Sequence, residues 1–181
     1  MTELLRAAGR HEAAALGDAV TPAGFREAMS RFPTGVTVLT SRAADGTPRG
    51  LTCSSLCSVA LHPPTLLVCV RRGSPALHAM LERGAFAVNL LHRGAHRTAE
   101  LFASGAPDRF DRVTWQFEPG HGGPHLIEAA HTIADCRIAS RRDVGDHTVI
   151  FGEVFGTTRL CDREPLLYGL RRYAEWPSEN S

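Results

Sequence analysis

The segment Val36-Thr37-Val38-Leu39-Thr40 indicates the fold class, because its β-branched residues favour an extended strand. The turn signal Ala44-Asp45-Gly46 follows, and an Asp-Gly pair is typical of a β-hairpin. Residues 50–61 then continue as strand until His62-Pro63-Pro64 breaks it. This stretch predicts a β-hairpin near the start of a mainly β domain.

Further strands are expected along the rest of the chain, at residues 65–70, 86–91, 132–140, 147–157 and 166–173. Short helices are expected at residues 75–82 and at about 95–103. Many short strands joined by turns favour a closed or partly closed antiparallel barrel. The strands do not alternate with long helices, and no G-x-G-x-x-G motif follows the first strand, which argues against a parallel doubly wound sheet.

Upstream of the first strand, Thr21-Pro22 predicts the start of a helix, with Thr as the N-cap and Pro at the first helical position. Phe25, Met29 and Phe32 form an apolar stripe at helical spacing, and Pro33 ends the helix.

Chain length and composition suit a single domain, with 181 residues of which 43% are hydrophobic and 22% charged. Residues 1–20 are rich in alanine and polar residues, and we interpret them as an N-terminal extension, either disordered or helical. The domain is expected to span residues 21–176, and residues 177–181 form a C-terminal tail.

The net charge of +1 provides no strong field toward nucleic acid or a membrane surface, so neither is expected as a partner. No apolar run approaches the roughly 18 residues that a membrane span needs. The N-terminus carries an acidic Glu3 and only a short apolar run at 13–16, unlike a signal peptide. We therefore expect a cytoplasmic protein.

The five cysteines, Cys53, Cys57, Cys69, Cys136 and Cys161, include no C-x-x-C pair. They are interpreted as small buried hydrophobic residues rather than as disulfide partners. The histidine pairs at 92/96 and 121/125 lack further ligands, so no metal site is expected.

One candidate ligand site is Arg71-Arg72-Gly73-Ser74-Pro75, which follows an apolar strand and opens a helix. Ser74 suits the N-cap position, and free N–H groups at a helix start bind phosphate. The alternative is a capped surface helix with two solvated arginines. Local sequence leaves both open.

Two further segments carry polar groups that could bind a ligand. Thr52-Cys53-Ser54-Ser55 would let a flat ligand lie close to the backbone, or it would be an exposed polar strand edge. His147, after the Gly145-Asp146 turn, is either a functional or a structural histidine.

An ordered series of segments extends from about Thr21 to Trp176. It comprises Phe25-Arg26-x-x-Met29, Phe32–Thr40, Asp45-Gly46, Gly50–Ser55, Ser58-Val59, Pro63-Pro64, Phe86–Leu91, Phe102-Ala103, Asp108–Phe110, Gly145–His147, Gly152–Val154 and Pro165–Tyr168. In order and spacing, this series resembles the flavin reductase-like family, which includes the reductase components of two-component flavin-dependent monooxygenases.

The resemblance implies a split antiparallel β-barrel of the FMN-binding type, forming a homodimer with flavin near the subunit interface. It implies an NAD(P)H:flavin oxidoreductase that passes a hydride from nicotinamide to flavin N5 and supplies reduced FMN or FAD to a partner monooxygenase. Such a reaction needs no side chain as a classical acid or base. The alternative is a non-catalytic FMN-binding or electron-carrier protein of the same fold.

The resemblance also implies site residues by position. Around the flavin it places Thr34, Thr52, Cys53, Ser54, Ser55, Cys69, Val70, Arg71, Arg72, Ser74 and Asn89. On the nicotinamide side it places His147 and Tyr173. Leu170-Arg171 departs from the family's usual C-terminal pattern. FMN against FAD and NADH against NADPH stay open, because Arg71, Arg72, Arg171 and Arg172 are all candidates for an extra phosphate.

Overall fold

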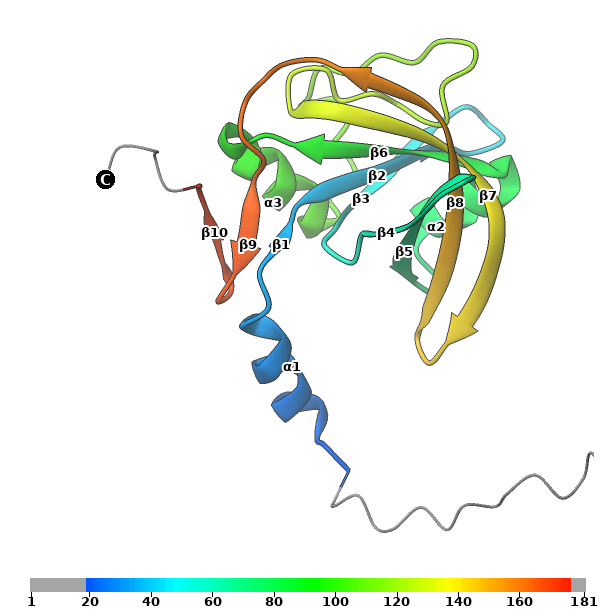
Figure 1. The fold of residues 1–181 in the computed structure, drawn as a ribbon. Helices are drawn as coiled ribbons and strands as arrows, with labels where there is room; N and C mark the ends of the chain where they lie inside the picture. Colours follow the sequence, from blue (N-terminus) through cyan, green and yellow to red (C-terminus); the bar gives the residue numbers. More distant parts are fainter. Residues whose placement is uncertain (1–18, 177–181) are drawn as a thin grey trace, which may run out of the picture.

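The computed structural model describes residues 19–176, and the central feature of its fold is a seven-stranded antiparallel sheet in the order β3-β2-β6-β7-β8-β5-β4 (Figure 1). Its strands are β2 (Thr37–Arg42), β3 (Pro48–Cys53), β4 (Cys57–Leu61), β5 (Pro64–Arg71), β6 (Ala85–Leu91), β7 (Ala130–Val144) and β8 (His147–Arg159). The two edge strands, β3 and β4, follow one another in the chain, and β3 also contacts β5. The prediction of a mainly β, antiparallel barrel is confirmed.

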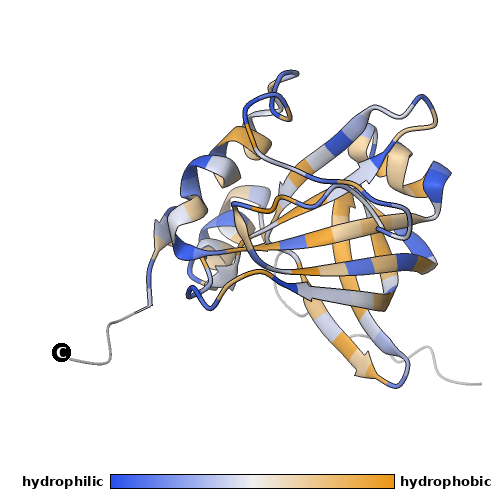
Figure 2. Ribbon diagram, turned by 90° about the horizontal axis from the view of Figure 1, so that it is seen from above, coloured by the Kyte–Doolittle hydropathy of each residue, from blue (hydrophilic) through white to orange (hydrophobic). Residues whose placement is uncertain are grey.

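The core fills the curved sheet and is covered by two short helices. Leu39, Val68, Phe86 and Ile150 are fully buried within the barrel. Helix α2 (Pro75–Arg83) adds its apolar face, including Met80, to this cluster. Figure 2 shows apolar bands alternating with paler ones along the strands, as expected for a sheet with one buried face.

A second cluster lies under helix α3 (His96–Ser104), which follows the short 3₁₀ helix η1 (Arg93–Ala95). Phe102 and Phe110 meet edge to face there, with ring centroids 5.1 Å apart. Both helices match the two expected from the sequence. No helix within residues 19–176 is long and apolar enough to cross a membrane.

The expectation of one continuous strand over residues 50–61 was wrong. It is broken at Ser54–Leu56, because β3 pairs with β2 whereas β4 pairs with β5. The chain must leave one edge of the barrel and join the other, and a single straight strand cannot do both.

The expectation of a single strand over residues 166–173 was also wrong. This segment forms a hairpin of β9 (Leu167–Gly169) and β10 (Arg172–Ala174), and β1 (Thr34–Gly35) completes a small three-stranded sheet. Leu170 and Arg171 form the turn with positive φ angles of 50° and 59°. Side chains other than glycine rarely adopt this conformation, which is why the turn was not expected.

Helix α1 (Pro22–Ser30) begins as the sequence predicts, with the Thr21 hydroxyl accepting a hydrogen bond from the Gly24 amide (3.1 Å). It extends away from the barrel (Figure 1), and none of its residues is buried. Residues 1–18 of the expected N-terminal extension, and the expected tail at 177–181, lie outside the described residues.

Candidate functional site

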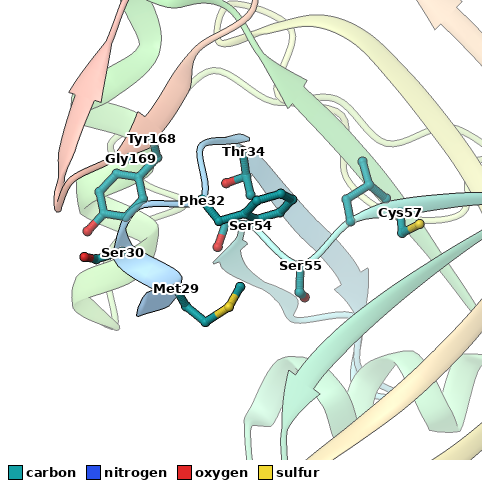
Figure 3. A pocket seen from close by; sticks show the side chains of 10 residues that line it. Met29, Ser30, Phe32, Thr34, Ser54, Ser55, Cys57, Tyr168 and Gly169 are labelled. Carbon is teal, nitrogen blue, oxygen red and sulfur yellow. The ribbon is translucent and has the colours of Figure 1, made fainter. Parts of the chain in front are cut away.

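A pocket of about 370 Å³ lies between helix α1, the β3–β4 linker and strand β9. We call it the α1 cleft. Its lining residues are Met29, Ser30, Phe32, Thr34, Ser54, Ser55, Leu56, Cys57, Tyr168 and Gly169. Figure 3 shows Phe32, Thr34 and Ser54 close together within it. The cleft thus combines aromatic and aliphatic surface with several hydroxyl groups, a combination that suits a flat heteroaromatic ligand.

Three predicted flavin residues, Thr34, Ser54 and Ser55, meet in the α1 cleft. The hydroxyl of Ser55 donates a hydrogen bond to the carbonyl oxygen of Cys69 (3.1 Å) and accepts one from its amide (2.9 Å). Ser55 therefore anchors the β3–β4 linker to β5. Ser54 is exposed, and its hydroxyl has no hydrogen-bond partner among residues 19–176, so it is free for a ligand.

Thr52 and Cys53, which were expected to line the flavin edge, are not among the residues that line the α1 cleft. The Thr52 hydroxyl donates to the carbonyl oxygen of Ala99 (2.6 Å), so it faces helix α3. Cys53 is buried, and burial raises the pKa of its thiol. Both side chains face the protein interior because strand β3 packs between the core and helix α3.

Strand β5 connects the cleft to the start of helix α2. Cys69 is bonded to Ser55, and Arg71 follows two residues later, a rise of about 6.6 Å along a strand. Val70, between them, is buried in the core and presents no side chain to a ligand on this route. The predicted residues from Ser54 to Ser74 thus form a line running from the cleft to a helix N-terminus.

Ser74 occupies the N-cap of α2, as predicted, but its hydroxyl makes no capping hydrogen bond. Gly73 has a φ of 76°, and no atom lies within 4 Å of the position that a Cβ would take. The space beside this glycine is therefore open to a ligand. The hydroxyl and the first N–H groups of the helix therefore keep their capacity for an anion, which the sequence alone could not show.

The two arginines before Ser74, Arg71 and Arg72, differ in whether their side chains are already hydrogen-bonded. Arg72 is attached to the β7–β8 turn, with its amide bonded to the carbonyl oxygen of Asp146 (2.9 Å) and its guanidinium 3.4 Å from that of Gly145. The Arg71 side chain has no ion pair or hydrogen bond among the described residues. Arg71 is therefore the better candidate for a phosphate.

His147 pairs directly with Arg71 across β5 and β8. Its Nδ1 lies 2.8 Å from a carboxylate oxygen of Asp146, and this hydrogen bond holds the pKa of Asp146 below its usual value. Within one chain, His147 therefore lies at the α2 end of β5 and not among the residues that line the α1 cleft.

Tyr173, the second residue expected on the nicotinamide side, packs inward. Its ring lies 5.3 Å from that of Tyr168 and 6.5 Å from that of His96, and burial raises the pKa of its hydroxyl. Tyr168, its partner in the hairpin, is the tyrosine that lines the cleft.

Residues 29–177 match the family model described as flavin reductase like domain. The chain belongs to the flavin reductase-like family. It is 48% identical over 163 residues to the flavin reductase (NADPH) of Lentzea aerocolonigenes, covering 90% of this chain and 95% of the relative. It is also 48% identical over 158 residues to the flavin reductase (NADH) of Kitasatospora aureofaciens, covering 86% and 82%.

Solved structures agree with the fold of this flavin reductase-like chain. The Streptomyces globisporus C-1027 NADH:FAD oxidoreductase SgcE6, in complex with NAD and FAD fragments, superposes with a TM-score of 0.80 at 34% identity, covering 91% of this chain and all of that one. BorF, the flavin reductase component of a bacterial two-component tryptophan halogenase, gives 0.77 at 29% identity, covering 88% and 100%. The expected family and its split-barrel fold are confirmed.

Asn89 is the predicted flavin residue that lies farthest inside this flavin reductase-like barrel. Its amide nitrogen donates to the carbonyl oxygen of Val38 (3.1 Å) and to the hydroxyl of Thr40 (3.0 Å). Its amide oxygen accepts from the amide of Leu126 (2.8 Å). The side chain is completely buried, so Asn89 positions the barrel strands and the Leu126 loop rather than contacting a ligand in the cleft.

Sequence reasoning missed seven residues of the cleft, namely Met29, Ser30, Phe32, Leu56, Cys57, Tyr168 and Gly169. The apolar stripe of the expected helix included Met29 and Phe32. It did not show that these side chains are 46% and 62% exposed and line a pocket. Cys57 was expected to be buried, yet it is exposed, because every residue of edge strand β4 is exposed. Cys53 and Cys136 are buried as expected, and all five cysteines are free thiols.

Proposed function

We propose that this chain uses NAD(P)H to reduce a flavin held in the α1 cleft and supplies the reduced flavin to a partner monooxygenase. The chain is an NAD(P)H:flavin oxidoreductase that works with FMN or FAD and with NADH or NADPH. When bound, the flavin supplies the ring that accepts the hydride from the nicotinamide. The protein's contribution is to hold the two rings at about 3–3.5 Å and to exclude water.

The line of residues from the α1 cleft to the start of α2 is the observation that supports this proposal. The Thr34 and Ser54 hydroxyls would bind polar atoms at the ring edge, while Phe32 and Met29 would cover its apolar part. At the other end, Arg71 and Ser74 would bind the flavin phosphate, helped by the free N–H groups of α2. The side chains present therefore fit both the aromatic and the anionic part of FMN.

A homodimer is the assembly that the exposed apolar residues favour. Phe25, Met29 and Phe32 expose 57%, 46% and 62% of their surface, and Leu61 on β4 exposes 76%. A second copy covering α1 would bury these side chains and close the α1 cleft to water.

Two observations support the proposed partner and compartment. BorF, which shares this fold, is the reductase component of a two-component halogenase, and this supports a flavin-dependent oxygenase as the partner. Five free thiols suit a reducing cytoplasm. Neither His147 nor Tyr173 lines the α1 cleft within one chain. Their proposed place on the nicotinamide side would therefore need the second copy of the dimer, and kinetics test it.

Anaerobic stopped-flow mixing tests the function. The purified chain with FMN should bleach the flavin band on addition of NADH or NADPH, at a rate that saturates with donor concentration. Flavin bound in the same stoichiometry but reduced no faster than free flavin would instead identify the chain as a non-catalytic flavin carrier.

A further inference from the structure

A second pocket, of about 370 Å³, lies on the hairpin side of the α1 cleft. We call it the hairpin pocket. Its lining residues are Arg31, Pro33, Leu167, Tyr168, Gly169, Leu170, Arg172 and Ala174. Tyr168 and Gly169 line both pockets, so the two cavities adjoin across the β9 strand. A molecule that reaches the flavin ring has the hairpin pocket directly beside it.

Charge distinguishes the hairpin pocket from the α1 cleft. Arg31 and Arg172 are on its wall, and no Asp or Glu among the described residues lines it. Arg172 makes no ion pair or side-chain hydrogen bond within residues 19–176. Two guanidinium groups on one pocket wall bind a phosphate well, since each offers paired N–H donors.

Glu27 pairs with two arginines beside the hairpin pocket. One of its oxygens lies 3.5 Å from Arg31 and the other lies 3.4 Å from Arg171. The cluster of three arginines and one glutamate therefore keeps an excess of positive charge. Arg171 faces helix α1, whereas Arg172 faces the pocket.

The turn that presents Arg172 is held in an unusual conformation. Leu170 and Arg171 both have positive φ angles, and the Leu170 amide is bonded to the carbonyl oxygen of Ser30 (2.6 Å). Docking on α1 thus fixes a backbone that these residue types disfavour, and conformations of this kind cluster at ligand sites. The hairpin thereby places Arg172 at the pocket that Arg31 also lines.

We propose that Arg172 and Arg31 bind the 2′-phosphate of NADPH and so make this reductase prefer NADPH to NADH. The inference rests on the proposed function, which puts the nicotinamide ring in the α1 cleft and leaves the rest of the dinucleotide to enter the adjoining pocket. Sequence identity does not decide the donor, because the NADPH and NADH reductases are both 48% identical to this chain. The structure selects Arg172 among the four arginines that the sequence left open.

Steady-state kinetics of Arg172→Gln with both donors, at saturating FMN, tests the proposal. The wild type should prefer NADPH. The variant should raise the KM for NADPH at least tenfold and change that for NADH less than twofold, and Arg172→Lys should recover part of the loss. Inhibition by 2′,5′-ADP should weaken in parallel, while inhibition by 5′-AMP should not. Arg171→Gln removes the same charge one residue away and should keep the wild-type donor ratio.

Each other outcome overturns the proposal. An equal loss with both donors would place Arg172 at a group that they share, and an unchanged ratio would remove it from the donor site. A loss seen only when FAD replaces FMN would assign the pocket to the flavin's adenylate part. Failure of the wild type with either donor would instead contradict the reductase function itself, before any variant is compared.

Discussion

The barrel buries its apolar residues, whereas its outer layer leaves them exposed to solvent. By outer layer we mean α1, β4 and the small sheet β1-β9-β10. In the barrel, Leu39, Val68 and Phe86 are completely buried by the chain itself. In the outer layer, α1 buries no residue and β4 is exposed throughout. The barrel buries its apolar groups within one chain, whereas the outer layer exposes apolar groups that we propose contact the flavin and a second copy.

A glycine-to-alanine exchange in each region should give the largest difference in the free energy of unfolding. A Cβ on Gly123 would come within 2.2 Å of the Thr40 carbonyl oxygen, whereas a Cβ on Gly35 in β1 would meet nothing within 4 Å. Gly123→Ala should lower the free energy of unfolding by about 3 kcal/mol, and Gly35→Ala should change it by less than about 0.5 kcal/mol. Urea unfolding measures both, and equal effects would contradict the distinction between core and outer layer.

Placing a charge on the apolar face of α1 tests the role of the outer layer. Phe25 is exposed within one chain. Phe25→Glu should weaken the proposed dimer at least tenfold, about 1.4 kcal/mol, because it would put a carboxylate into the proposed contact. Light scattering should then show mass moving from twice 19.6 kDa toward 19.6 kDa at low concentration. Phe155→Glu, at an exposed phenylalanine of β8, is the matched control and should keep the wild-type mass.

Removing the His147 ring should give a smaller effect, and it tests whether the barrel also reaches the nicotinamide. His147→Ala should raise the KM for NAD(P)H about fivefold, near 1 kcal/mol, while flavin affinity stays within twofold. Steady-state kinetics and flavin titration separate the two quantities. Weaker FMN binding with an unchanged KM would assign His147 to the phosphate end, beside its strand neighbour Arg71.

Local signals in the sequence were sufficient for much of the fold. The Thr21-Pro22 helix start, the Asp45-Gly46 hairpin and the Ser74-Pro75 helix start depend on residues within a few positions of one another, and the structure has all three. The break between β3 and β4 depends on which distant strand each one joins, so the local pattern could not show it.

The sequence pointed to segments that border a pocket, but it did not give the directions of their side chains. Thr34, Ser54 and Ser55, which were expected around a flavin, line the α1 cleft. Thr52 and Asn89 instead bond to Ala99 and Leu126, partners 47 and 37 residues away in the chain. Only the tertiary structure decides whether a polar side chain meets such a partner or a ligand.

The central claim is that β5 connects a ring-binding cleft to a phosphate-binding helix start, and comparing FMN with riboflavin tests it most directly. Arg71→Ala should weaken FMN binding at least tenfold, about 1.4 kcal/mol or more, because a charge-assisted hydrogen bond to the phosphate is lost. Riboflavin, which has no phosphate, should bind within twofold of wild type. Arg72→Ala, whose guanidinium faces the Gly145 carbonyl, is the control and should change FMN binding less than threefold. An equal loss for FMN and riboflavin in Arg71→Ala, or no loss for either, would contradict the account.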